Sequence, residues 1–100
     1  MSSTTALVRH RVADYDAWKA TYDRFAPTQA QHGVRAHQVL RSRENPTDLV
    51  ITHTFDDLET AKAFFVLPEL KRAMTEAGVD ENSVKVAFYD EVEAGTLISA

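Results

Sequence analysis

The sequence predicts an α+β fold of the ferredoxin-like class, a split βαβ arrangement with a four-stranded antiparallel sheet and helices on one face. Three observations predict it. A strand–helix–strand pattern occurs twice, in residues 6–43 and again in residues 49–93. Apolar side chains recur at every second position in the expected strands and at spacings of three and four in the expected helices. The 100 residues fit one domain, 1–100, without a linker. This topology places the first and third strands side by side in the middle of the sheet.

The first strand is expected over residues 6–12. Its alternate residues on the face toward the helices are Val8, His10 and Val12. Asp14 follows at the position of a helix N-cap. The next helix carries an aromatic stripe formed by Tyr15, Trp18, Tyr22 and Phe25. Pro27 predicts a kink or a split in this helix, because proline removes a backbone donor and clashes with the preceding turn. Gly33 is expected to end it.

The second strand is expected over residues 34–43. If alternation starts at its first residue, the side chains facing the helices are Val34, Ala36, Gln38 and Leu40, and those on the outer face include His37 and Val39. Residues 44–48 have turn chemistry, with Asn45 before Pro46, so a hairpin should lead into a third strand at residues 49–55. The inner face of that strand carries Leu49, Ile51, His53 and Phe55.

The second half repeats the pattern. Asp56 or Asp57 is expected to cap a helix whose buried stripe is Leu58, Ala61, Phe64 and Phe65. Pro68 fits the first turn of a further short helix, and Gly78 is expected to end it. The fourth strand, residues 84–93, should direct Val84, Val86, Phe88 and Val92 toward the helices.

The outer face of the sheet predicts a homodimer in which two sheets face each other. The residues expected there are Leu7, Arg9, Arg11, Val39, Val50, Thr52, Thr54, Ala87 and Tyr89. Leu7, Val50 and Tyr89 are poorly suited to water. Arg9 and Arg11 are expected to meet Glu91 across the neighbouring strand. The alternative is an exposed sheet with a few tolerated apolar residues.

Composition excludes several classes of function. The formal net charge is −4 and the basic residues are scattered, which argues against a nucleic-acid partner. Cysteine is absent, so no thiolate chemistry is expected. The chain has 3 glycines and no Rossmann or P-loop motif, so no nucleotide cofactor is expected. No segment predicts a signal peptide or a membrane span, and the expected location is the cytoplasm.

The histidines are the candidate catalytic groups. His10 and His53 lie on the two central strands, on the face toward the helices and beneath the aromatic stripe. Imidazole is the side chain best suited to proton transfer near neutral pH. We therefore expect His10 as a general base and His53 as a group that orients it or the ligand. The alternative is that both are core histidines bonded to a backbone carbonyl or a tyrosine.

A metal site is a further alternative. Three histidines with an open coordination position can bind zinc or copper. His10, His37 and His53 are the candidate ligands. The expected alternation places His37 on the opposite face, so the prediction is no metal site. A one-residue bulge in the second strand would reverse that objection.

Nearly the whole chain resembles a known superfamily. The matching runs are ALVRHRVADYDAWKATYDRFAP, HGV, RENPTDLVITHTFDDLETAKAF, LPELKRAMTEAGV and FYDEVE. They are similar to small bacterial proteins of the dimeric α+β barrel superfamily, which are labelled cyclase-like or antibiotic-biosynthesis-monooxygenase-like. Its members include cofactor-independent monooxygenases and polyketide cyclases, lactone isomerases, haem enzymes and proteins without known activity. No complete catalytic set of a monooxygenase or cyclase can be matched onto this chain.

The resemblance implies a ligand cavity between sheet and helices and a homodimer. We expect a small cofactor-independent monooxygenase or cyclase acting on an aromatic, polyketide-like substrate. The residues expected to bind that substrate are Trp18, Tyr22, Gln38, Phe55, Phe64 and Phe88. A non-catalytic dimeric ligand-binding or accessory protein is the alternative.

Overall fold

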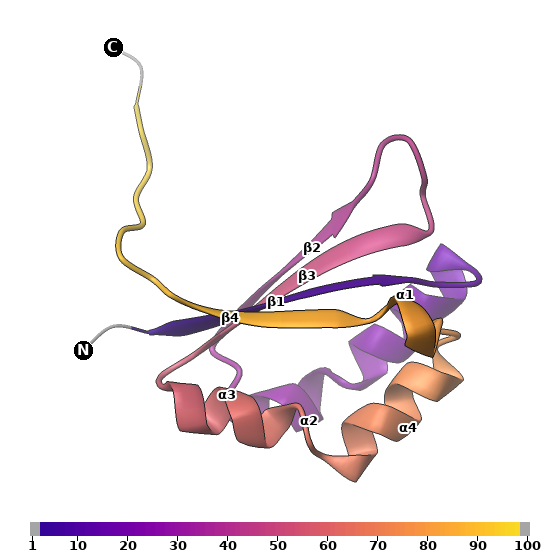
Figure 1. Cartoon of the computed structure of the whole chain (residues 1–100), viewed down its shortest axis with the longest axis horizontal. Helices are drawn as coiled ribbons and strands as arrows, with labels where there is room; N and C mark the ends of the chain where they lie inside the picture. The colour runs from indigo at the N-terminus through magenta and orange to yellow at the C-terminus, as the bar shows by residue number, and fades with distance from the viewer. Residues whose placement is uncertain (1–2, 99–100) are drawn as a thin grey trace.

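The computed structural model describes residues 3–98 and confirms the predicted fold class. Its elements are β1 (Thr4–Arg11), α1 (Tyr15–Arg24), α2 (Ala26–Gln31), β2 (Ala36–Arg41), β3 (Asp48–Phe55), α3 (Leu58–Phe64), α4 (Pro68–Glu76), a 3₁₀ turn (Glu81–Ser83) and β4 (Lys85–Asp90). The strands lie in the order β2-β3-β1-β4 and every neighbouring pair is antiparallel. All four helices cover one face of this sheet (Figure 1).

The helix ends follow the local sequence. Asp14 caps α1 by accepting a hydrogen bond from the backbone N–H of Ala17 at 2.9 Å. Pro27 splits the helical segment as predicted, because α1 ends at Arg24 and α2 begins at Ala26. Asp57, rather than Asp56, caps α3 through the N–H of Thr60 at 2.8 Å. Gly33 and Gly78 follow helices α2 and α4 with φ values of 94° and 79°, which favour glycine.

The faces of β2 are the reverse of the prediction. Val39 pairs with Ile51 and His37 pairs with His53, so both share the face of β3 that meets the helices. The reversal begins at the start of the strand. The N–H of Arg35 donates to the carbonyl of Thr54 at 2.8 Å, although the residue paired with Thr54 in the ladder is Ala36. Two consecutive residues therefore face one residue of β3, as in a β-bulge, and the extra residue moves every later side chain to the other face.

This bulge corrects the placements of four residues. Gln38 pairs with Thr52 and lies on the outer face, not among the core side chains as predicted. Val39 and His37 lie on the helix side, where Val39 packs against the main core cluster. Leu40 takes the place of Val39 on the outer face and is 48% exposed.

The core lies between the sheet and the helices in two clusters. The larger cluster contains Val8, Val12, Trp18, Leu49, Ile51, Ala77 and Val79. The smaller contains Ala6, Phe55, Ala61 and Phe64. By contrast, α4 has no fully buried residue, and its N-cap Leu67 makes no side-chain capping bond. Leu70 and Met74 of α4 are partly buried and pack against these two clusters.

The charged residues of β1 pair differently from the prediction. Arg9 lies 3.2 Å from Asp48 and Arg11 lies 3.5 Å from Asp80. Glu91 accepts a hydrogen bond from Ser3 at 2.9 Å, at the opposite end of the strand. The expected contacts of Arg9 and Arg11 with Glu91 are therefore wrong, because the register pairs Arg9 with Lys85 and Thr4 with Asp90.

After β4 the chain continues as an extended segment that leaves the sheet (Figure 1). Its apolar residues Val92, Leu97 and Ile98 are 89–100% exposed. Within residues 3–98, none of the helices has the length and apolar character needed to cross a membrane.

Candidate functional site

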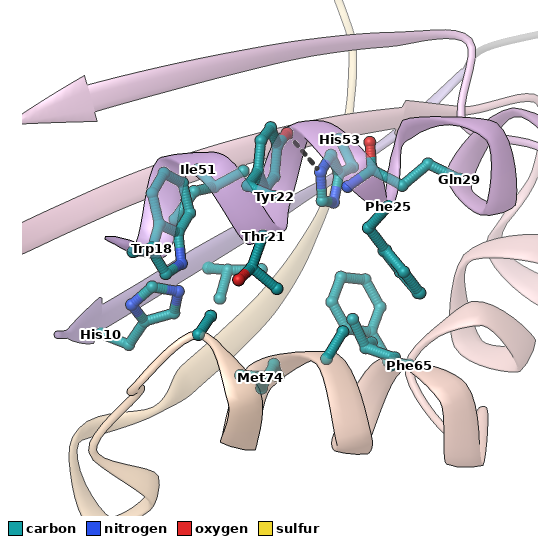
Figure 2. Close-up of a pocket in the computed structure, with 14 residues that line it drawn as sticks. His10, Trp18, Thr21, Tyr22, Phe25, Gln29, Ile51, His53, Phe65 and Met74 are labelled. Carbon is teal, nitrogen blue, oxygen red and sulfur yellow. Dashed lines mark hydrogen bonds between the residues drawn. The ribbon is translucent and has the colours of Figure 1, made fainter. Parts of the chain in front are cut away.

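A narrow apolar cavity of ≈ 60 Å³ lies between the two central strands and helices α1, α2 and α4 (Figure 2). The sheet contributes Val8, His10, Ile51 and His53. The helices and the loops that follow them contribute Trp18, Thr21, Tyr22, Phe25, Gln29, Phe65, Leu70, Ala73, Met74 and Ala77. Aromatic and aliphatic walls with few polar groups are typical of sites for small organic ligands.

His53 is the buried polar group at one end of this cavity. Its side chain comes from β3 and is surrounded by the rings of Phe55, Phe64 and Phe65 at centroid distances of 5.7–6.5 Å. Nε2 lies 3.1 Å from the hydroxyl oxygen of Tyr22, whereas Nδ1 is buried and has no hydrogen-bond partner within residues 3–98. Burial, helped by the nearby His37, lowers the pKa of His53 to about 4. The ring is therefore neutral at pH 7.

Tyr22 connects His53 to the edge of the sheet. Its hydroxyl oxygen lies 2.9 Å from Nδ1 of the exposed His37 on β2. Its ring stacks on Trp18, with centroids 4.8 Å apart and an interplanar angle of 22°. Burial raises the pKa of Tyr22 to about 12. The phenol is thus held protonated between two imidazoles.

His10 is the buried polar group at the other end. It is 4% exposed and meets the edge of Trp18 at a centroid distance of 5.9 Å. Like His53, it has a buried Nδ1 without a partner among the described residues. Burial lowers the pKa of His10, and its own backbone and Asp48 oppose that shift. The core-histidine alternative is therefore met in part at His53, whose Nε2 bonds Tyr22, whereas Nδ1 has no partner among the described residues in either histidine.

The two imidazoles are too far apart to contact each other. His10 pairs with Leu49, and His53 pairs with Ala6, so four steps of the same ladder separate them. At about 3.3 Å per residue, this separation is about 13 Å between backbones. His53 consequently cannot orient His10 directly, and a contact between them would require a ligand that reaches both.

The same separation bears on the three-histidine metal site. His37 lies beside His53, as the bulge requires, but His10 is at the far end of the cavity. Among the residues that the structure describes, no group of three His, Cys, Asp or Glu side chains could hold a metal ion.

The structure brings four predicted site residues to the cavity, which are His10, Trp18, Tyr22 and His53. Phe55 and Phe64 are 0% and 1% exposed and fill the smaller core cluster, with Phe88 packed against it. They are not among the residues that line the cavity. Gln38 lies in a shallow hollow of the outer face. A role in binding a ligand in the cavity is therefore not supported for these four residues.

Sequence reasoning missed two buried polar residues of the cavity, Thr21 and Gln29, which are 8% and 5% exposed. Gln29 follows Phe25 by four residues, so it continues the aromatic stripe across the break between α1 and α2. A polar residue in an apolar stripe was the available signal. Arg24 donates to the hydroxyl of Thr21 at 3.1 Å, which satisfies that oxygen.

Sequence comparison identifies one protein family. A family model described as antibiotic biosynthesis monooxygenase matches residues 4–76, which is most of the chain. The match includes β1, β3 and the helices that enclose the cavity, together with both buried histidines. A search of curated proteins finds no match.

Several solved structures share the fold. SnoaB, a cofactor-independent oxygenase from Streptomyces nogalater, has 17% identity and a TM-score of 0.69, covering 99% of this chain and 100% of SnoaB. A protein from Bordetella bronchiseptica, provisionally described as an antibiotic biosynthesis monooxygenase, has 12% identity and a TM-score of 0.77, covering 93% and 100%. One from Chloroflexus aurantiacus, with the same provisional description, has 19% identity and a TM-score of 0.70, covering 95% and 98%. At these identities the likeness establishes the fold alone.

Proposed function

The chain belongs to the antibiotic biosynthesis monooxygenase family, and from that premise we propose that it is a small cofactor-independent monooxygenase. The proposed substrate is a flat, aromatic, polyketide-like phenol or ketone with an acidic C–H or O–H group. His10 and His53 are the proposed catalytic residues. Trp18 and Tyr22 are the proposed walls of the substrate site.

One observation carries this proposal. His10 and His53, each 4% exposed, both line the same apolar cavity, and each has a buried Nδ1 without a hydrogen-bond partner among residues 3–98. A buried polar atom without a partner costs about 1–3 kcal/mol. A ligand that supplies a hydroxyl would offset that cost, because the lowered pKa values keep both rings neutral at pH 7 and a neutral imidazole can accept a hydrogen bond.

The chemistry needs only a base and dioxygen. Removal of a proton from an activated ring CH₂ leaves a carbanion, which transfers one electron to O₂, and the resulting radicals combine to a peroxide. Loss of the second C–H proton breaks the O–O bond and leaves a ketone and water. One oxygen atom enters the product and the other enters water, so the four electrons that O₂ accepts come from the CH₂ carbon. A cyclase would share the first step, because a ring-closing aldol begins with the same carbanion.

Cavity size constrains the substrate complex. A volume of ≈ 60 Å³ is far smaller than the roughly 300–1,000 Å³ of typical ligand pockets. A polycyclic ligand therefore requires α4 to move away from the sheet. This helix carries Leu70, Ala73 and Met74 of the cavity wall and has no fully buried residue. We propose that the ligand enters beneath α4.

A homodimer through the outer face of the sheet is part of the same proposal. The bulge in β2 places Leu40 beside Val50 on this face, and Leu7, Ala87 and Tyr89 continue the apolar surface across β1 and β4. Tyr89 is 55% exposed and Leu40 is 48% exposed. Covering such a surface with a second copy would remove it from water.

The experiment is oxygen uptake with anthrone, a three-ring ketone with one acidic CH₂. Protein freed of metals with a chelator should consume one O₂ per anthraquinone formed, and ¹⁸O₂ should place one labelled atom in the product. His10→Ala and His53→Ala should each lower the rate by about 10²–10⁴-fold. His32→Ala, at the end of α2 and outside the cavity, is the matched control and should leave the rate unchanged.

Other outcomes would identify other functions. Quenching of Trp18 fluorescence by aromatic ligands without any product would support the non-catalytic binding protein. Ring closure of a linear polyketide analogue without oxygen uptake would support a cyclase. Equal rates for His10→Ala, His53→Ala and the control would refute both histidines as catalytic residues.

A further inference from the structure

The hydroxyl of Tyr22 lies between two histidines of neighbouring strands. Its oxygen is 2.9 Å from Nδ1 of His37 and 3.1 Å from Nε2 of His53. The tyrosine and His53 rings are parallel within 4°, and the tyrosine and His37 rings within 28°. Figure 2 shows the bond between Tyr22 and His53 at the edge of the cavity. His37 is exposed, whereas His53 is buried, so this chain of polar atoms runs from the cavity to the surface.

We propose that His37 and Tyr22 form a proton relay that connects His53 in the cavity to solvent. This inference rests on the proposed function, because the proton it carries is the one that the substrate loses. It concerns the proton that His53 accepts and leaves the proposed role of His10 at the far end of the ligand unchanged. Tyr22 then transfers a proton in addition to lining the cavity. His37 does not touch the substrate and is a positioning residue that acts through Tyr22.

The relay requires one position for each exchangeable hydrogen of His53, Tyr22 and His37. Before reaction, His53 carries its hydrogen on Nε2 and donates it to the tyrosine oxygen, Tyr22 donates to Nδ1 of His37, and His37 carries its own hydrogen on Nε2. When the substrate gives a proton to Nδ1 of His53, the Nε2 hydrogen moves to Tyr22, the tyrosine hydrogen moves to His37, and His37 releases its Nε2 hydrogen to water. One proton enters and one leaves. The return of a proton by the same path restores the starting state.

The groups around the relay favour proton transfer from His53 toward solvent. Apart from His37, the neighbours of His53 on β1 and α3 and in the loop after α3 are Ala6, Phe64 and Phe65. The cavity residues of α4 are apolar as well. Asp23 is the charged group near Tyr22, and it disfavours loss of the tyrosine proton. A cation is therefore tolerated poorly at His53, so a proton that arrives there is favoured to leave along the relay.

A merely structural pair of hydrogen bonds would not require a solvent-exposed third member. The ring of Tyr22 is already fixed by stacking on Trp18, and β2 is already paired with β3 along its length. The bulge at Arg35 is what turns His37 to this face, since without it the side chain would lie on the outer face. The local backbone irregularity thus completes the path.

The first test needs no substrate. Two-bond ¹H–¹⁵N spectra of ¹⁵N-histidine-labelled protein report which ring nitrogen carries hydrogen. The relay requires hydrogen on Nε2 and not on Nδ1 in both His53 and His37. Tyr22→Phe should abolish this single form in both residues. The matched control Tyr15→Phe, on the same helix but outside the cavity, should leave both spectra unchanged. Hydrogen on Nδ1 of His53 would overturn the relay, whether or not the protein has oxygenase activity.

The second test uses turnover of anthrone. His37→Gln should lower the rate by about 10-fold at low buffer concentration, below the roughly 10²–10⁴-fold loss expected for a direct base. Added imidazole should restore it, because a small base can replace the exposed end. The same imidazole should not restore Tyr22→Phe, where the path is broken inside the protein. An unchanged rate for His37→Gln beside a large loss for His53→Ala would refute the relay and leave the proposed function standing.

Discussion

Tyr22 and His53 hold each other with parallel rings and a hydrogen bond of 3.1 Å between the phenol oxygen and Nε2. This contact uses Nε2 of the imidazole, whereas Nδ1 has no hydrogen-bond partner within residues 3–98. In the proposed function, the bond to Tyr22 fixes the ring and Nδ1 is the nitrogen that meets the ligand.

Trp18 is expected to be a principal contributor to stability. Its side chain is 3% exposed and packs against His10, Tyr15 and Tyr22. Trp18→Ala should lower the free energy of unfolding by about 3–5 kcal/mol, the usual cost of emptying a large aromatic site. Chemical denaturation measures it. Val66→Ala, at a position 80% exposed, is the control and should change stability by less than about 0.5 kcal/mol. Equal effects of the two substitutions would place Trp18 outside the core.

Stability should decrease on acidification because of the buried histidines. His53 has an ordinary pKa of 6.5 when unfolded and about 4 when folded. Between these values the unfolded chain binds the proton and the folded chain does not, so stability is full above pH 6.5 and is lost as pH falls toward 4. At about 1.4 kcal/mol per pH unit, this window removes about 3 kcal/mol. The lowered pKa of His10 acts in the same direction.

The matched variants for this pH effect are His53→Phe and His32→Gln. Denaturation curves at several pH values should show a flatter profile between pH 6.5 and 4 for His53→Phe, because the titrating group is gone. The profile of His32→Gln should follow that of the unmodified protein. A His53→Phe profile as steep as the unmodified one would contradict the assignment.

Gly33 permits the close approach of α2 to α3. Its φ is +94°, and a Cβ at this position would lie 2.5 Å from Cγ2 of Thr60. Gly33→Ala should destabilise the fold by about 1–3 kcal/mol through backbone strain and this clash together. Thr60→Ser removes the methyl group that causes the clash. Adding it to Gly33→Ala should restore the part of the stability that the clash costs, but not the part that backbone strain costs. No recovery in the double variant, measured against Thr60→Ser alone, would show that the clash contributes nothing.

Helix ends were predictable because they depend on local chemistry, and the strand order followed from the repeated strand–helix–strand pattern. Asp14, Pro27 and Gly78 act within one or two turns of themselves, and the structure bears each of them out. Alternation also placed His10 and His53 correctly, since β1 and β3 are regular over eight residues each.

The bulge at Arg35 and Ala36 was not predictable in the same way. It depends on how Gly33 and Val34 leave α2 and reach β3, and that is a tertiary constraint without a sequence signature. The extra residue places His37, and not Gln38, on the cavity side. The predicted site therefore wrongly included Gln38, which lies on the outer face, and omitted His37, which bonds Tyr22. Aromatic composition likewise could not separate Phe55 and Phe64, which fill the core, from Phe25 and Phe65, which line the cavity.

The protein is expected to dimerise through the outer face of its sheet. Tyr89→Glu places a charge within that face and should raise the dimer dissociation constant at least about 10-fold, because an unpaired buried charge costs more than about 1.4 kcal/mol. Val66→Glu, on the exposed surface of the helical side, is the control. Sedimentation equilibrium measures both. A monomeric unmodified protein at micromolar concentration would contradict this prediction.

In the proposed complex, His10 and His53 hold the two ends of a flat phenolic ligand. A crystal structure with 2,6-dihydroxyanthraquinone, a three-ring phenol with a hydroxyl at each end, would reveal this arrangement. We expect the ligand between the sheet and a displaced α4, with one hydroxyl about 2.6–3.2 Å from Nδ1 of His53 and the other directed at Nδ1 of His10. A ligand bound on the outer face, or one in the cavity that leaves both Nδ1 atoms without a contact, would contradict it.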